Sequence, residues 1–216
     1  RQHACMTVTN GFIEWRKTIS LNMTIPGYTY GTQTVQRASI TLEEFELPKK
    51  TVLFGSDDVK ALQQSKAVVQ DHVEAILDVW YGFVGSNPHL VSTFLRVADG
   101  QPDMDYLGAV RKRFGQWILD TASGIYDQTW LDYQFEIGRR HHRMGKNVTD
   151  NVAAAPHIPF RYLPALLYPV TATLRPFLAK QGHSEAEVSA MHQAWIKSVL
   201  LQVILWSYPY VKEGDF

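Results

Sequence analysis

Apolar residues recur at the three- and four-residue spacing of α-helices along most of this chain. After Ser56, for example, one helical face carries Val69, Val73, Ile76 and Trp80. The alternation of apolar and polar residues that marks a half-buried strand does not stand out anywhere in the sequence. The pattern therefore predicts an all-α domain, whose helices bury apolar faces against one another.

The composition is that of a globular protein, with 45% hydrophobic and 19% charged residues. Lys plus Arg and Asp plus Glu both number 21, and this balance argues against a protein held to nucleic acid or to an anionic membrane by bulk charge. The single cysteine, Cys5, cannot form an internal disulfide. We therefore expect a cytoplasmic protein with no nucleic-acid partner. We also expect no membrane partner, because no apolar run is long enough to span a bilayer.

Residues 25–50 are rich in turn formers, and residues 25–31 among them are expected to form an ordered loop, while residues 1–24 form an N-terminal extension of unknown role. Ser56 is expected to cap a helix that has Asp57 and Asp58 in its first turn and ends near Gly85. Glu187 completes a capping box with Ser184. The further helices are expected at about 89–96, 103–121, 126–145, 159–180 (kinked by its prolines) and 184–211.

The helix expected at 126–145 has one face made of Trp130, Gln134, Ile137, His141 and Met144. A histidine in line with an apolar stripe suits a metal site that needs only one protein ligand. The iron of haem is such a metal, because the porphyrin supplies four nitrogen ligands and leaves one to the protein. An ordinary zinc site needs three or four protein ligands.

The ordinary alternative is a partly buried histidine whose hydrogen bonds are satisfied by the fold. His142 has its own apolar row, Leu131, Phe135 and Gly138, so spacing alone does not choose between the two histidines. The remaining histidines are scattered and do not suggest a non-haem metal site.

Four motifs, in this order along the chain, resemble those of the protoglobins: WYGFVGS at 80–86, AVRKRF at 109–114, YQFEIGRRHHR at 133–143 and LWSYPYV at 205–211. Protoglobins are single-domain haem globins of archaea and bacteria that are related to globin-coupled sensors. The resemblance extends from about residue 25 to residue 216, so it identifies 25–216 as a protoglobin haem domain and leaves 1–24 outside it.

The resemblance implies a globin fold of the three-over-three type with an extra N-terminal segment and no D helix. It implies that His141 is the single protein ligand of the iron of haem b, and that Trp80 and Tyr81 form a distal aromatic pair. Val110 and Phe114 match distal positions on the following long helix. The loop at 25–31 would cover the haem, and the last two long helices would form a homodimer.

Further residues are expected at the cofactor. Ile137 lies one turn before His141, and Arg113 belongs to a basic cluster that would help to neutralise the two propionates. Leu166 stands where the family has an aromatic residue, so we expect a roomier pocket there. Pro164 is an additional proline that could shift the backbone around Leu166.

The chemistry of the distal residues can be argued without the family. The Val110 side chain cannot donate a hydrogen bond, whereas the Tyr81 hydroxyl can donate one to a bound gas. The alternative for Tyr81 is a core tyrosine bonded to a backbone carbonyl, and for Trp80 it is simple packing against the porphyrin.

The function expected from these features is reversible binding of oxygen, carbon monoxide and nitric oxide at a five-coordinate iron. One alternative is a haem enzyme that acts on nitric oxide, nitrite or peroxide, which would need a separate reductase. Another is a gas sensor that signals through a separate partner. A haem-free helical structural protein is the least favoured. A homodimer is also expected from the apolar residues of the last helix, unless residues 1–24 cover them. Five of these residues cannot all point into one small core: Val199, Leu200, Val203, Ile204 and Trp206.

Overall fold

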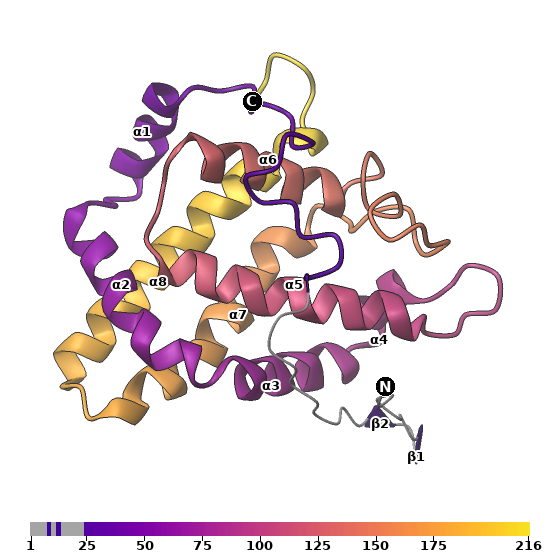
Figure 1. The fold of residues 1–216 in the computed structure, drawn as a ribbon, viewed down its shortest axis with the longest axis horizontal. Helices are drawn as coiled ribbons and strands as arrows, with labels where there is room; N and C mark the ends of the chain where they lie inside the picture. Colours follow the sequence, from indigo (N-terminus) through magenta and orange to yellow (C-terminus); the bar gives the residue numbers. More distant parts are fainter. Residues whose placement is uncertain (1–7, 10–11, 14–23) are drawn as a thin grey trace.

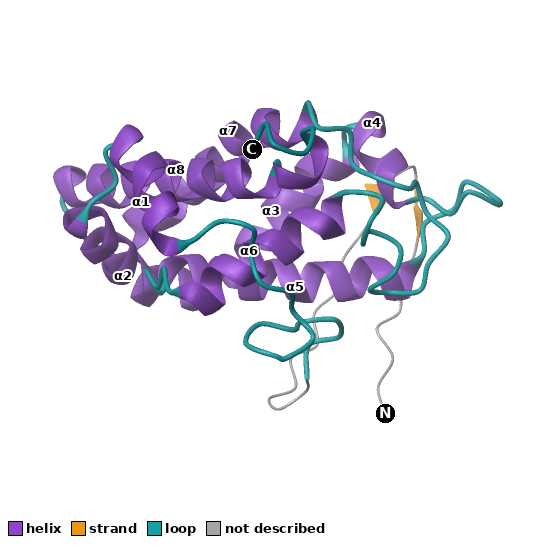
Figure 2. Cartoon of the chain, turned by 90° about the horizontal axis from the view of Figure 1, so that it is seen from above, coloured by secondary structure: helices purple, strands orange, loops and turns teal. Residues whose placement is uncertain are grey.

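The computed structural model describes residues 8–9, 12–13 and 24–216, and this part of the chain is mostly helical (Figure 1). Two short strands, β1 (Val8–Thr9) and β2 (Phe12–Ile13), pair antiparallel. The rest of the N-terminal extension, including Cys5, lies outside the described residues. Figure 2, a perpendicular view, shows helices throughout the body and loops around its periphery.

The helices that follow have these bounds: α1 (Leu42–Thr51), α2 (Ser56–Gln70), α3 (Val73–Gly85), α4 (Pro88–Val91), η1 (Ser92–Phe94), α5 (Met104–Ala122), α6 (Gln128–His141), α7 (Tyr162–Leu178), η2 (Ala179–Gln181), α8 (Glu185–Trp206) and η3 (Tyr208–Tyr210). No helix is described between η1 and α5, which agrees with the expected absence of a D helix. The fold is all-α and globin-like, as the sequence predicted.

Helix α1 lies in the stretch that is rich in turn formers, where no helix was expected. It begins with a capping box in which the Thr41 hydroxyl accepts from the backbone N–H of Glu44 and the Glu44 carboxylate accepts from that of Thr41. Phe45 is buried against Trp130, with ring centroids 5.4 Å apart. This short helix was not predicted because the surrounding residues are rich in turn formers and because it contains Pro48 near its end.

The expected helix from Ser56 to about Gly85 is two helices, because the chain breaks at Asp71 and His72. The predicted N-cap was also one residue late: Gly55 is the N-cap, and its N–H donates to the Asp58 carboxylate at 2.9 Å. Asp57 and Asp58 do lie in the first turn, as predicted.

The capping box of Ser184 and Glu187 at the start of α8 is confirmed. Pro164 lies in the first turn of α7, where backbone N–H groups have no intrahelical acceptor, so it needs no break in the helix.

Glu185–Tyr210 is the one segment of the described chain with the length and apolar character of a membrane span, but much of it is buried in the core of the fold.

In Figure 1, α5 lies between α6 and α3, and the segment after residue 24 runs across α6 and α5. Helix α7 packs against both α3 and α8, and α8 also packs against α2 and α6. This arrangement leaves a space among α3, α5, α6, α7 and α8.

Candidate functional site

A cavity of about 250 Å³ lies in this space, and its walls are mostly apolar. The sequence analysis named eight residues of the site, and the structure brings all of them to this cavity: Trp80, Tyr81, Val110, Arg113, Phe114, Ile137, His141 and Leu166. These residues come from α3, α5, α6 and α7, so the fold gathers positions that are up to 86 residues apart.

His141 reaches the cavity as the last residue of α6. The N-cap of the helix is Asp127, whose carboxylate accepts from the Trp130 N–H at 2.8 Å, and its last turn is basic, as the helix dipole favours. It ends four residues before the expected 145. Met144 therefore does not belong to the predicted face and is exposed.

The His141 ring is held in one orientation. Its Nδ1 lies 2.8 Å from the Ile137 carbonyl oxygen. Because a carbonyl can only accept, Nδ1 carries the proton and Nε2 keeps its lone pair. Burial lowers the pKa of His141, which favours this neutral form. Among the described residues, Nε2 has no hydrogen-bond partner, and the residue borders the cavity.

His142 is placed differently, although periodicity could not separate it from His141. It caps the C-terminus of α6 and packs edge-on against Tyr210, with ring centroids 5.0 Å apart, and it does not line the cavity. The Tyr210 hydroxyl lies 2.7 and 2.8 Å from the carbonyl oxygens of His141 and Ile158, so its one proton is shared between them and holds this end of α6.

Aromatic side chains from α3 and α5 form one wall of the cavity. Phe114 is the central one, because its ring lies 5.7 Å from Trp80, 6.5 Å from Tyr81 at 89°, and 5.1 Å from Trp117 in a stacked arrangement. Leu166 on α7 is a partly buried member of the same core. The wall excludes water by packing and leaves few polar groups to compete for a small ligand.

Tyr81 is buried, and burial raises the pKa of its hydroxyl well above the ordinary value, so the group keeps its proton at neutral pH. The Arg111 guanidinium lies over its ring, 5.6 Å from the centroid. The sequence analysis singled out Tyr81 as the distal hydroxyl, but Tyr106 on α5 also lines the cavity, and burial raises its pKa to about 12.

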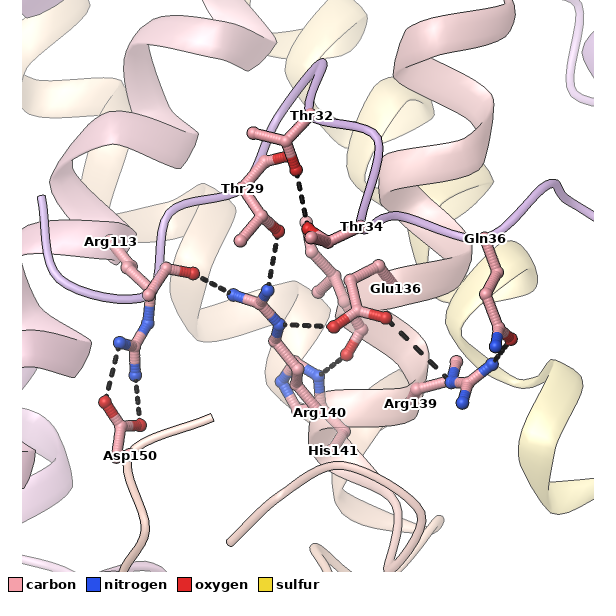
Figure 3. A network of polar contacts seen from close by, with 12 residues as sticks. Thr29, Thr32, Thr34, Gln36, Arg113, Glu136, Arg139, Arg140, His141 and Asp150 are labelled. Carbon is pink, nitrogen blue, oxygen red and sulfur yellow. Dashed lines mark hydrogen bonds and ion pairs between the residues drawn. The ribbon is translucent and has the colours of Figure 1, made fainter. Parts of the chain in front are cut away.

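Two arginines border the polar edge of the cavity and hold the segment 25–31 (Figure 3). Arg113 makes two bonds to the Asp150 carboxylate, at 2.8 and 2.6 Å, and donates to the Pro26 carbonyl oxygen at 2.7 Å. Arg140 bonds Glu136, and it also donates to the Gly27 carbonyl oxygen and to the Thr29 hydroxyl. Gly27 has φ of +72°, and an added Cβ there would lie 2.5 Å from Arg113.

Tyr28 anchors the same segment to α5. Its hydroxyl donates to the Asp120 carboxylate at 2.8 Å, and Gln116 donates to the other oxygen of that carboxylate, also at 2.8 Å. Burial raises the pKa of both Tyr28 and Asp120. The Tyr28 ring meets Tyr133 edge-on with centroids 5.5 Å apart, so an aromatic group closes the cavity on this side.

Lys146 is a cation at the cavity that no sequence pattern indicated. It lies in the turns after α6, is only 3% exposed, and lines the cavity. Its neighbours in the sequence give no periodic signal, because they belong to no helix or strand.

The family model described as Protoglobin matches residues 41–216. Among solved structures, the globin domain of the Geobacter sulfurreducens globin-coupled sensor is similar, with a TM-score of 0.61 and 16% sequence identity over 80% of this chain and 99% of that one. At this identity the likeness shows the fold alone. No curated protein matches the chain.

Proposed function

The chain belongs to the protoglobin family, and from this membership we propose that it is a haem protein that reversibly binds diatomic gases. The proposal takes haem b as the cofactor, His141 as its single protein ligand, and oxygen, carbon monoxide and nitric oxide as the gases. The observation that carries it is the His141 imidazole beside the cavity: its Nδ1 is bonded to the Ile137 carbonyl oxygen, and its Nε2 has no hydrogen-bond partner within the described part of the chain.

The residues around the cavity fit haem in three respects. A neutral imidazole is available as the one ligand that the porphyrin leaves to the protein. The walls are apolar and aromatic, as a flat macrocycle requires. Positive side chains, among them Arg113, border the cavity and would balance the charge of the propionates.

When bound, the haem iron supplies one open coordination position for a gas molecule. Phe114 and Val110 line the cavity with apolar side chains that offer no hydrogen bond, and the Trp80 ring adds aromatic surface beside them. The Tyr81 hydroxyl, which burial keeps protonated, would donate a hydrogen bond to a polar ligand and stabilise it by roughly 1.5–3 kcal/mol. Leu166 would leave more room than an aromatic ring at the same position.

An absorption spectrum of the purified chain tests the proposal. We expect a Soret band that shifts on reduction with dithionite and again on addition of carbon monoxide. A purified chain with no Soret band, which also fails to acquire one when haem is added, would contradict it.

A second candidate function is gas sensing through a separate partner, since the similar fold described above is the globin domain of a globin-coupled sensor. Arg140 lies next to His141 and holds Gly27 and Thr29, so a movement of the ligand histidine could reach the surface segment. Hydrogen exchange of residues 25–31 with and without carbon monoxide tests this. Equal exchange in both states would remove the support for sensing by this route.

We also propose that the chain is a cytoplasmic homodimer that associates through α7 and α8. The sequence argument from surplus apolar residues on the last helix is weak, because Val199 and Val203 are buried within one chain. The exposed face of α7 offers better support, since Tyr168 is 77% exposed there. Sedimentation of the wild type and of Tyr168→Glu would test the dimer; a wild-type mass that stays near 24.6 kDa on concentration would reject it.

A further inference from the structure

Lys146 places a buried amine at the cavity. Its side chain is almost completely removed from solvent, and its Nζ donates to the backbone carbonyl oxygen of Thr93 at 2.7 Å. The Nζ also lies 5.5 Å from the centre of the Tyr106 ring. Burial of an ammonium group is unfavourable unless an anion or several acceptors compensate it, and this burial lowers the pKa of Lys146 to about 8.

The compensation within the chain is incomplete. An ammonium group has three N–H donors, and the bond to Thr93 uses one of them. Within the described part of the chain, no carboxylate lies within ion-pair distance of Lys146. Asp150, the acid whose charge acts on it, is held by two bonds to Arg113.

The two arginines that line the cavity differ from Lys146 in this respect. Arg113 is paired with Asp150, and Arg140 is paired with Glu136 at 2.9 Å. Both also bond carbonyl oxygens of the segment 25–31. Among the described residues, Lys146 is thus the lysine or arginine at this cavity that has no carboxylate partner.

We propose that Lys146 binds a carboxylate of the cofactor inside the cavity. This rests on the proposed function, since haem is the group that would bring two carboxylates into an apolar space. A carboxylate there would accept one or both remaining N–H groups and offset the cost of burying the charge. The cofactor carboxylate would thus contact a lysine, whereas the sequence had pointed to the basic cluster that contains Arg113.

The test compares haem with its dimethyl ester, in which both carboxylates are masked. The affinity of each for the full-length cofactor-free chain is measured by Soret titration in the wild type, in Lys146→Met and in Lys146→Gln. The glutamine amide can still donate to the Thr93 carbonyl but carries no charge, so it separates the charge from the existing hydrogen bond. Lys112→Met, at an exposed position of α5, is the matched control.

We expect the wild type to bind haem more tightly than the ester. Both Lys146 variants should lose about tenfold or more in affinity for haem and little for the ester, as expected for one charge-assisted hydrogen bond. Lys112→Met should change neither affinity.

An equal loss for haem and ester, or no loss for either, would overturn the assignment. Circular dichroism of each cofactor-free variant checks that it folds, and Lys146→Gln keeps the test decisive if the methionine variant does not. A wild type that binds neither compound would instead contradict the proposed function itself.

Discussion

The indole ring of Trp206 lies nearly parallel to the imidazole of His141, with ring centroids 5.2 Å apart and planes inclined by 14°. The indole is fixed in turn, because its Nε1 donates to the Gln134 side-chain oxygen at 2.9 Å. The hydrogen bond from Nδ1 of His141 to the Ile137 carbonyl oxygen fixes the rotation of the imidazole ring. The Trp206 indole packs against one face of that ring. The end of α8 therefore orients the residue that we propose as the haem ligand.

This stacking requires α6 and α8 to approach closely, and Gly138 permits the approach. A Cβ at this position would lie 2.9 Å from the Trp206 Cα and 3.0 Å from its carbonyl oxygen. Because the obstacle is backbone, Gly138→Ala must move one helix. We expect the free energy of unfolding to fall by about 1–3 kcal/mol despite the better helix propensity of alanine, as urea denaturation would measure.

Gly108→Ala on α5 is the matched control, because an added Cβ there meets nothing within 4 Å. It should leave stability unchanged or raise it by roughly 0.5–1 kcal/mol, since alanine favours a helix over glycine. Equal effects of the two substitutions would show that the contact of α6 with α8 is not tight at Gly138.

The two adjacent histidines should behave differently. His141→Ala removes the imidazole at the cavity, so we expect loss of haem or a form whose Soret band is restored by added imidazole. His142→Ala removes a ring that packs on Tyr210 away from the cavity, so its Soret band should persist. Absorption spectra of the two purified variants decide the matter, and equal retention of haem would refute the assignment of His141.

Tyr81→Phe should speed the dissociation of oxygen by roughly tenfold if about 1.4 kcal/mol of hydrogen-bond energy is lost, and should affect carbon monoxide much less. Stopped-flow measurement of both off-rates checks this. Tyr106→Phe is the control, since it removes a different tyrosine hydroxyl, from α5, that also lines the cavity. A faster off-rate in Tyr106→Phe alone would transfer the proposed role to Tyr106.

The residues lining the cavity could be predicted because they lie on the regular faces of long helices. The amphipathic pattern places Ile137 and His141 on one side of α6, and the resemblance to a family supplies the positions of Trp80 and Phe114 on other helices. Periodicity could not choose between His141 and His142, because both have apolar rows. The choice depends on where α6 ends and where Tyr210 packs.

Features outside the long helices could not be predicted in the same way. The helix break at Asp71 and His72 interrupts a continuous apolar pattern, and local sequence signals do not show it. Lys146 reaches the cavity through a series of turns, whose path depends on contacts with the rest of the fold. Its carbonyl partner, Thr93, lies 53 residues earlier in the chain.

The burial of Lys146 predicts an unusual dependence of stability on pH. The pKa of Lys146 is lowered to about 8 in the folded chain, whereas an unfolded lysine titrates near 10.4. Between these values the unfolded chain binds a proton that the folded chain does not, so this residue makes stability rise with pH. Below about pH 8 both states are protonated, and the destabilising contribution of Lys146 is constant and at its largest.

Urea denaturation of the cofactor-free wild type and of Lys146→Met at pH 7 and pH 10 isolates this contribution. Relative to the variant, the wild type should gain on the order of 1–3 kcal/mol at the higher pH. The comparison uses the change with pH because the variant also loses the bond to Thr93, which shifts its stability at every pH. A difference between the two proteins that stays the same from pH 7 to pH 10 would mean that the folded chain leaves the amine with its ordinary pKa.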